Sequence, residues 1–497
     1  MSLAIVHSRA QVGVEAPCVS VEAHLANGLP SLTLVGLPET AVRESKDRVR
    51  SALLNAGFDF PARRITLNLA PADLPKDGGR FDLAIALGIL AASGQLPGTT
   101  LDGLECLGEL ALSGAIRPVR GVLPAALAAR DARRVLVVPK ENAEEASLAS
   151  GLTVFAVDHL LEIAGHLSGQ APLLPYQARG LLRAPFPYPD LAEVQGQAAA
   201  KRALLVAAAG AHNLLLSGPP GTGKTLLASR LPGLLPALDE DEALEVAAIH
   251  SVASHVPLRH WPQRPFRQPH HSASAPALVG GGSRPQPGEI TLAHQGVLFL
   301  DELPEFERKV LEVLREPLES GEIVIARANG RVRFPARFQL VAAMNPCPCG
   351  YLGDPSGRCR CTPEQVQRYR GKLSGPLLDR IDLHVSVLRE STSLQPGHGE
   401  TATAEISERV GAARQRQLAR QGCANAHLDL QAMHRNCALA EADRRWLEAA
   451  GERLELSLRA LHRILKVART LADLERIDAI ERRHLAEALQ YRATTST

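Results

Sequence analysis

The feature that most constrains this chain is a glycine-rich loop between an apolar run and a helical pattern. Leu214–Leu216 lead into GPPGTGKT, which continues directly into LLASRL. Glycines let successive backbone N–H groups turn toward phosphate oxygens, while the lysine supplies a charge for the β/γ-phosphates and the threonine a hydroxyl for Mg²⁺. The flanking pattern disfavours a chance glycine turn and predicts an ATP site in a parallel α/β sheet. The expected nucleotide-binding residues are Gly218, Pro219, Pro220, Gly221, Thr222, Gly223, Lys224 and Thr225.

A second motif supplies the carboxylates that such a site needs. In the run GVLFLDE, four apolar residues are followed by Asp301 and Glu302. A nucleotide triphosphatase requires one carboxylate to hold Mg²⁺ and one to polarise the attacking water, so we assign Asp301 to the metal and Glu302 to the water. The alternative is that these acidic residues only cap the next helix. The phosphate loop earlier in the chain favours the catalytic interpretation.

Charge and composition exclude several classes of protein. Lys and Arg number 55 against 53 Asp and Glu, a net charge of +2, which excludes a polycationic arm, an acidic tail and a wholly basic nucleic-acid wrapper. No apolar stretch approaches the roughly 18–20 residues of a membrane span. Residues 1–17 lack the pattern of a signal peptide. We therefore expect a cytoplasmic protein without membrane contact, in which the 8 cysteines stay reduced.

Two breaks in the helical and strand patterns divide the chain. Five prolines interrupt 171–190, and STSLQPGHGETA at 391–402 forms the second break. We predict an α/β domain at 1–170, an α/β ATPase core at 191–390 and an all-helical lid at 403–497, with the two breaks as linkers. The expected strands of the first domain are 18–25, 31–35, 64–69, 135–139 and 152–157, and the expected lid helices are 430–439, 442–450, 456–474 and 479–489.

Four cysteines lie close together in CPCGYLGDPSGRCRC. Four thiolates suit tetrahedral zinc, although the one-residue spacing within each pair is shorter than the common spacing. Reduced free thiols in a loop and a redox switch are the alternatives. The candidate zinc ligands are Cys347, Cys349, Cys359 and Cys361. Basic residues that would let this loop touch DNA are Arg358, Arg360, Arg368, Arg370 and Lys372.

These motifs, together with three further segments, resemble AAA+ ATPases of the magnesium-chelatase-like group. The segments are VAAMNP at 341–346, LSGPLLDRIDL at 373–383 and LSLRALHRILKVARTLADL at 456–474. The resemblance is closest to the ComM type, also called YifB, and covers essentially the whole chain. It implies an AAA+ core with a parallel sheet, a helical lid, the use of ATP with Mg²⁺, and assembly into a hexameric ring.

The same resemblance assigns three further catalytic residues. Asn345 is implied as the sensor-1 residue beside the γ-phosphate, Arg380 as the arginine finger for a neighbouring subunit's nucleotide, and Arg459 as the sensor-2 arginine of the lid. The alternatives are that Arg380 pairs with its neighbours Asp379 and Asp382, and that Arg459 is not the functional arginine, since Arg463 and Arg469 lie on the same helix.

Two segments of the ATPase core are candidates for partner contacts. The alternating runs of 322–336 meet around an Asn-Gly pair, which predicts a β-hairpin. In related ring ATPases such a hairpin points into the pore, which implies that Arg327, Arg331 and Arg333 contact a DNA backbone; solvated arginines are the alternative. The Gly/Pro/Ser-rich insertion 266–290 carries His270 and His271, for which we prefer a polar pore or interface role over metal binding.

The first domain resembles the proteolytic domain of Lon in 68–88 and 112–142. That enzyme uses a serine activated by a lysine. Here Arg80 stands at the serine position and Ala125 at the lysine position. We therefore expect a protease-like fold without peptidase chemistry, with a role in assembly or substrate contact.

The resemblance implies an ATP-hydrolysing motor on single-stranded or branched DNA, a helicase that promotes branch migration during natural transformation. One alternative is a chelatase motor that inserts magnesium into a tetrapyrrole. An ATP-dependent protease is the other, and Arg80 and Ala125 disfavour it.

Overall fold

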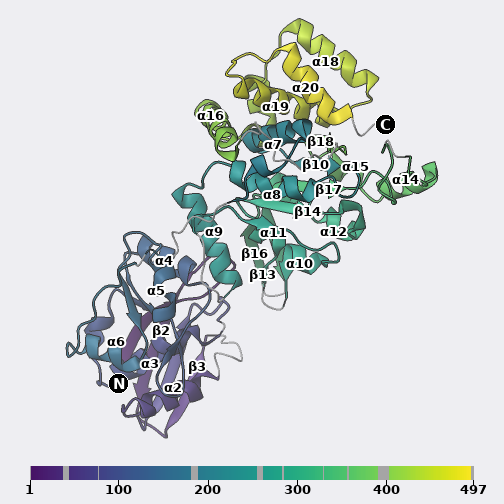
Figure 1. Ribbon diagram of the computed structural model, residues 1–497. Coiled ribbons are helices and arrows are strands. Elements are labelled where there is room, and N and C mark those ends of the chain that lie inside the picture. The colour runs from purple at the N-terminus through teal and green to yellow at the C-terminus, as the bar shows by residue number, and fades with distance from the viewer. Residues whose placement is uncertain are drawn as a thin grey trace.

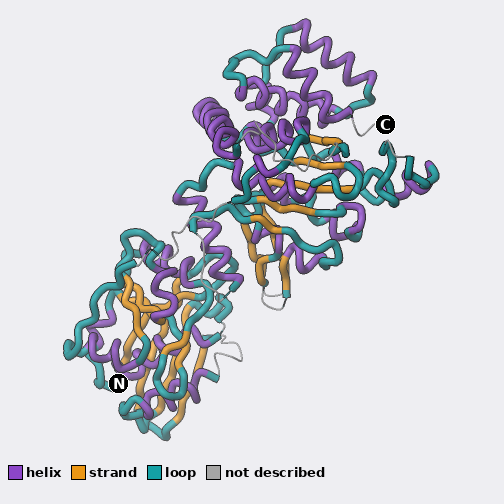
Figure 2. The backbone as a smooth tube through the Cα atoms, viewed as in Figure 1, coloured by secondary structure: helices purple, strands orange, loops and turns teal. Residues whose placement is uncertain are grey.

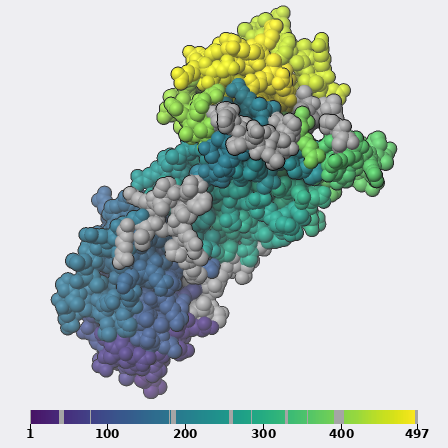
Figure 3. All heavy atoms as spheres, in the orientation of Figure 1, coloured from purple at the N-terminus to yellow at the C-terminus, as the bar shows by residue number. Residues whose placement is uncertain are grey.

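The computed structural model describes residues 2–36, 44–76, 78–178, 180, 188–254, 261–282, 285–327, 330–354, 357–389 and 402–493. Figure 1 shows three parts that follow one another along the molecule: an N-terminal sheet domain, a second α/β part and a helical C-terminal part. In Figure 3 the N-terminal part and the C-terminal helices lie at opposite ends, with the second α/β part between them. Among these residues we find no helix whose length and hydropathy would let it cross a membrane.

The N-terminal part is built on a seven-stranded mixed sheet in the order β3-β4-β2-β1-β5-β8-β9. Alternate residues of β2 are buried, as expected for a strand with one face on the core. The apolar helix α3 packs on β1 and β2 and is almost wholly buried. The strands are β1 (Ser2–Arg9), β2 (Cys18–Ala26), β3 (Ser31–Val35), β4 (Arg64–Ala70), β5 (Leu104–Cys106), β6 (Glu109–Leu110), β7 (Ile116–Arg117), β8 (Val135–Pro139) and β9 (Val154–Val157). The helices are α2 (Ser45–Asn55), α3 (Asp82–Ala92), α4 (Val122–Asp131), α5 (Ala143–Ala146) and α6 (Leu160–Leu167).

The second part holds a five-stranded parallel sheet in the order β11-β14-β17-β10-β18, which confirms the predicted parallel sheet. Strands β14 and β17 are buried along their whole length, because helices flank the sheet (Figure 2). Its strands are β10 (Leu214–Ser217), β11 (Phe266–Arg267), β12 (Gly280–Gly281), β13 (Gln286–Pro287), β14 (Val297–Leu300), β15 (Glu322–Arg327), β16 (Gly330–Pro335), β17 (Gln339–Met344) and β18 (Leu383–Ser386). Its helices are α7 (Ala198–Gly210), α8 (Lys224–Leu234), α9 (Glu240–Ala253), α10 (Ala275–Val279), α11 (Glu289–Leu292), α12 (Arg308–Glu312), α13 (Pro317–Ser320), α14 (Pro363–Arg370) and α15 (Gly375–Leu378).

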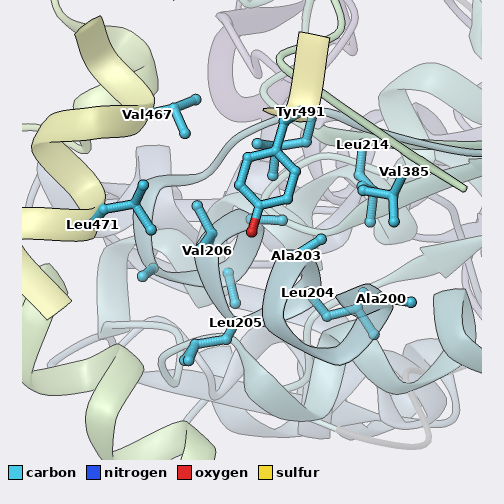
Figure 4. Close-up of a cluster of buried hydrophobic side chains, with 14 of the residues drawn as sticks. Ala200, Ala203, Leu204, Leu205, Val206, Leu214, Val385, Val467, Leu471 and Tyr491 are labelled. Carbon is cyan, nitrogen blue, oxygen red and sulfur yellow. The ribbon is translucent and has the colours of Figure 1, made fainter. Parts of the chain in front are cut away.

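The C-terminal part is helical, as predicted. Figure 4 shows Val467 and Leu471 of α19 facing Val206 of α7, with Tyr491 of α20 beside them. This shared apolar cluster joins the helices to the sheet part. The helices are α16 (Thr403–Gln421), α17 (Leu430–Asn436), α18 (Glu441–Arg453), α19 (Leu458–Leu474) and α20 (Arg482–Ala493).

The N-terminal part docks on the sheet part through α4 and α9, which lie side by side in Figure 1. The backbone N–H of Gly121 donates to the Ser251 carbonyl (2.9 Å), and that of Leu123 donates to the Ser251 hydroxyl (3.2 Å). Leu123 also packs in a small apolar cluster with Leu244 and Trp261. Although α9 lies within the sheet part of the chain, it therefore serves as the main bridge to the N-terminal part.

Candidate nucleotide-binding site

The glycine-rich loop lies between β10 and α8, at the carboxyl end of a strand that pairs with β17 on one side and β18 on the other. Gly223 has φ +84°, a left-handed conformation in which glycine is unstrained, and α8 begins at the next residue. At Gly218 an added Cβ would lie 2.1 Å from the Val387 carbonyl oxygen, so a side chain has no room. Both glycines are therefore required for the loop to turn into the helix.

A pocket of about 450 Å³ opens over this loop. The predicted carboxylate pair, Asp301 and Glu302, and the sensor-1 candidate, Asn345, line this pocket together with the phosphate loop. Gly218 and Pro219 contribute through their carbonyls rather than as lining residues. The lining residues are Pro220, Gly221, Thr222, Gly223, Lys224, Thr225, Leu226, Asp301, Glu302, Met344 and Asn345.

Lys224 is held against the loop by neutral acceptors. Its Nζ donates to the carbonyl oxygens of Gly218 (2.7 Å) and Pro219 (2.9 Å) and to Oδ1 of Asn345 (3.2 Å). Burial lowers the pKa of this ammonium, while the charges of Asp301 and Glu302 oppose that shift. Since these three acceptors carry no formal charge, the ammonium charge stays available to a phosphate.

Thr225 and Asp301 are the residues of this pocket that could hold Mg²⁺. The Thr225 hydroxyl donates to Oδ2 of Asp301 (2.7 Å), which places two oxygen ligands at the mouth of the pocket. Mg²⁺ takes oxygen ligands and keeps several waters, so a hydroxyl and one carboxylate beside a bound triphosphate suit it. Oδ1 of Asp301 accepts the backbone N–H of Glu302 (2.9 Å), which fixes the carboxylate plane.

Glu302 contacts His271 of the Gly/Pro/Ser-rich insertion 266–290. Its Oε2 lies 3.1 Å from Nδ1 of His271, and its backbone has φ +54°. The role expected for His270 and His271 is a polar pore or interface role; the structure places His271 beside Glu302, the candidate for water activation. This contact arises because β11, just before His271, pairs in parallel with β14, just before Glu302. No sequence pattern marks that pairing.

Arg380 lies away from this pocket and pairs with Glu319. Its Nη2 is 2.8 Å from Oε1 of Glu319, and its Nη1 donates to the Pro376 carbonyl (2.7 Å). The alternative of pairing with Asp379 or Asp382 is therefore wrong for the described residues, where Asp382 instead binds Arg463. The Arg380 side chain is only 6% exposed.

Arg459 shares the same carboxylate, with Nη2 2.6 Å from Oε1 of Glu319. The other two arginines of α19 are occupied in packing. Arg463 binds Asp382 and donates to the Arg380 carbonyl (3.2 Å), while the buried Arg469 pairs with Asp473 (3.2 Å).

Asp382 fixes this part of the lid on the sheet part. Burial alone would raise its pKa, but the charges of Arg463 and His212 hold it well below the usual range. His212 also bonds Thr470 of α19 (2.8 Å). A buried ionic contact thus joins α19 to the segment that carries Arg380.

The four cysteines of the loop before α14 converge. All four Sγ atoms lie within 4.8 Å of one another, with Cys347 3.3 Å from Cys349 and 3.8 Å from Cys359. Zinc with Zn–S bonds of about 2.3 Å holds its sulfurs about 3.8 Å apart, so the donor set fits. Backbone N–H groups of Tyr351 and Arg360 lower the pKa of Cys349 to about 6, which favours the thiolate.

The hairpin of β15 and β16 has two different faces. Ile325 and Phe334 are buried in the core, whereas Arg331 and Arg333 alternate with them and are exposed. The Arg327 side chain lies outside the described residues. The two described arginines thus share the face that points away from the core.

Arg80 and Ala125, the residues that the resemblance to Lon aligns with a catalytic dyad, provide neither a nucleophile nor a base. Arg80 is buried and donates to Oε1 of Gln11 (3.2 Å) and to the Gly121 carbonyl (3.5 Å). Ala125 is buried in α4. Arg80 therefore ties two loops of the domain together instead of offering a hydroxyl.

A parallel sheet with a phosphate loop, a strand-end Asp-Glu pair and a helical C-terminal part defines the class: a P-loop ATPase of the AAA+ type. The family match is more specific. Residues 21–142 match the family described as "Subunit ChlI of Mg-chelatase", 190–394 "Magnesium chelatase, subunit ChlI" and 400–492 "Magnesium chelatase, subunit ChlI C-terminal".

Some curated relatives align with almost the whole chain and others with part of it. Competence protein ComM of Haemophilus influenzae is 56% identical over 99% of this chain and 98% of its own length. YifB of Escherichia coli K12, named an uncharacterized protein, is 52% identical over 99% of this chain and 97% of its own. The magnesium-chelatase 38 kDa subunit of Rhodobacter capsulatus is 28% identical over 44% of this chain and 60% of its own. The chain belongs to the ComM/YifB family of magnesium-chelatase-like proteins.

Proposed function

We propose that this protein is an ATP-driven ring motor on DNA, a helicase that promotes branch migration during natural transformation. One observation carries the proposal: a pocket with every group needed for ATP hydrolysis except the arginines lies in a chain 56% identical, end to end, to a protein named for competence. ATP and Mg²⁺ would bind at Lys224, Thr225 and Asp301, with Glu302 polarising the attacking water and Asn345 beside the γ-phosphate.

The position of the arginines supports a ring. Arg380 and Arg459 pair with Glu319 rather than lining the pocket, so we assign both to the boundary with a neighbouring subunit. An arginine delivered from a neighbour neutralises the charge that spreads over the transferred phosphoryl group. We propose six subunits, on the strength of the family.

DNA contact is assigned to the hairpin and the cysteine loop. Arg331 and Arg333 present two charges on one exposed face, and Arg327 follows on the partner strand. Arg358 and Arg360 are exposed beside the cysteine cluster. Such side chains bind phosphates without reading sequence, which suits a motor that moves along DNA.

We assign structural zinc to the cysteine cluster. Protein purified without chelators should contain about one zinc ion per chain. The Cys347→Ser variant should lose the metal, while Cys423→Ser, outside the cluster, should retain it. Metal analysis by mass spectrometry measures both; a zinc content near zero in the wild type would leave the free-thiol and redox alternatives. A cytoplasmic location would keep these thiols reduced.

For the N-terminal part we propose a Lon-protease-like fold, at 1–170, without peptidase activity. Neither the guanidinium of Arg80 nor the methyl group of Ala125 can act as a nucleophile or a base, which supports the absence of peptidase activity. Residues 171–190 and 391–402 are proposed as linkers on either side of the ATPase core, 191–390, with the lid at 403–497.

A chelatase motor is the second candidate, because the matching families are described by magnesium-chelatase subunits. It would insert magnesium into a tetrapyrrole together with partner subunits. The low identity and partial coverage of the chelatase relative favour the DNA motor.

An ATP-dependent branch-migration assay on a synthetic DNA junction tests the proposed function. The wild type should move the junction, and Lys224→Ala should not, because the phosphates lose their lysine contact. Lys309→Ala, an exposed lysine on α12, is the matched control and should retain wild-type activity. Absence of junction movement by the wild type would contradict the proposal; chelation activity with partner subunits would favour the second candidate.

A further inference from the structure

Glu319 connects the two arginines that the proposed function assigns to the subunit boundary. A single atom, Oε1, lies 2.8 Å from Nη2 of Arg380 and 2.6 Å from Nη2 of Arg459. Arg380 follows α15 in the sheet part, and Arg459 lies at the start of α19 in the lid. One carboxylate therefore fixes the relative position of side chains from two separate parts of the chain.

The net charge at this contact is positive and attracts a further anion. Two guanidinium groups share one carboxylate, which leaves a net positive charge. The Arg459 side chain is half exposed, so its guanidinium has donors that a ligand can reach, whereas the Arg380 side chain is buried. Guanidinium groups have five N–H donors and favour phosphate oxygens. Glu319 thus holds the pair in place, while the net positive charge and the exposed donors of Arg459 remain available to a phosphate.

Glu319 also lies at the root of the β15–β16 hairpin. Its helix, α13, ends at Ser320, and β15 begins at Glu322. The Ser320 hydroxyl donates to the Glu322 carbonyl (3.0 Å), and the Ala336 N–H donates to the Gly321 carbonyl (2.8 Å), which closes the base of the hairpin. Because these bonds join α13 to both strands, a displacement of the hairpin moves Glu319 as well.

We propose that Glu319 is a positioning residue for ATP hydrolysis: it sets Arg380 and Arg459 as a pair at the subunit boundary and ties their position to the hairpin. The inference rests on the proposed function, in which these arginines serve a neighbouring subunit's nucleotide. It adds a residue that no sequence motif marks, and it names the route by which contact of the hairpin with DNA reaches the site of hydrolysis.

Steady-state ATP hydrolysis by the full-length Glu319→Gln variant provides the first test. Glutamine keeps the shape but removes the charge, so kcat should fall about tenfold or more from misplaced arginines, while KM for ATP stays within about twofold. Stimulation by single-stranded DNA should fall as well. Glu316→Gln, an exposed glutamate before the same helix, is the control and should match the wild type. A kcat for Glu319→Gln equal to that of the wild type would overturn the proposal.

Mixed rings separate positioning from general damage. Glu302→Gln subunits have intact arginines but no hydrolysis, whereas Glu319→Gln subunits have an intact pocket. A mixture should therefore hydrolyse ATP faster than the sum of its components, as should a mixture of Arg380→Ala with Glu302→Gln. If only the Arg380→Ala mixture recovers, the role of Glu319 is overturned. If neither recovers, the boundary role of the arginines fails, and this inference with it.

Discussion

Arg380→Ala is expected to abolish ATP hydrolysis while nucleotide binding remains intact. The pocket residues do not include Arg380, so the affinity for ATP in the same subunit should not change. An arginine finger accelerates phosphoryl transfer by roughly 10³–10⁵-fold, and turnover should fall by a factor in that range. Phosphate release and binding of a fluorescent ATP analogue measure the two properties separately.

Arg453→Ala is the control for this prediction, because Arg453 is exposed at the end of α18. It should leave turnover unchanged. Arg380→Lys would retain the charge but lose the fork of donors, so we expect little recovery. Turnover by Arg380→Ala at the wild-type rate would remove the role of this residue at the boundary.

Sequence patterns predicted those elements whose local signal is strong. Runs such as SLTLV and VLVVP are apolar and β-branched, and both became the strands expected of them, β3 and β8. Strand β1 was not predicted, although it lies inside the first sheet. Its Arg9 argues against a buried strand, and that position is acceptable because Arg9 makes a bidentate contact with the buried Glu105 and donates to the Ala16 and Ala128 carbonyls.

The lid also contains a helix that the sequence patterns did not predict. Helix α16 was not among the predicted helical segments, because its few buried apolar positions, Ile406, Val410 and Ala413, lie in a sequence rich in charged residues. Their spacing is helical, but the stripe is narrow. Polar bonds to the end of α7, including Arg414 Nη2 to the Ala208 carbonyl (2.8 Å), add to the packing of this stripe in the core. Such partners depend on the tertiary fold and leave no periodic pattern.

The sequence likewise predicted some residues of the candidate site and missed others. The phosphate loop and the Asp301-Glu302 pair have fixed spacing along the chain, and the structure places them around one pocket. Other contacts of the candidate site residues join distant segments: His271 with Glu302, and Glu319 with both arginines. Single polar residues in loops carry no spacing rule, so only the pairing of β11 with β14 and the docking of the lid reveal them.

The N-terminal part also contacts the hairpin through which we propose that DNA binding affects ATP hydrolysis. An added Cβ on Gly13 would lie 2.7 Å from Cγ1 of Val332, so this turn packs tightly against β16 of the hairpin. Gln11, two residues earlier, accepts from Arg80. Arg80 therefore supports the loop that contacts the hairpin, which physically links the N-terminal part to the hairpin.

Glu302→Gln is expected to trap the protein with bound ATP. Glutamine keeps the size of the side chain but cannot take a proton from water, and loss of a general base costs roughly 10²–10⁴-fold in rate. The Mg²⁺ position formed by Thr225 and Asp301 stays intact, so ATP affinity should remain near the wild-type value. Single-turnover hydrolysis and nucleotide retention after gel filtration measure the two effects.

Two further variants separate the role of Glu302 in water activation from the role of Asp301 in Mg²⁺ binding. Glu307→Gln, an exposed glutamate just before α12, should hydrolyse ATP normally. Asp301→Asn should weaken Mg²⁺-dependent ATP binding itself, because it removes a charged oxygen ligand. If Glu302→Gln lost ATP binding while Asp301→Asn kept it, the two roles would have to be exchanged. If Glu302→Gln turned over at the wild-type rate, the water would be activated by another group, and His271, 3.1 Å from Glu302, would be the first side chain to replace.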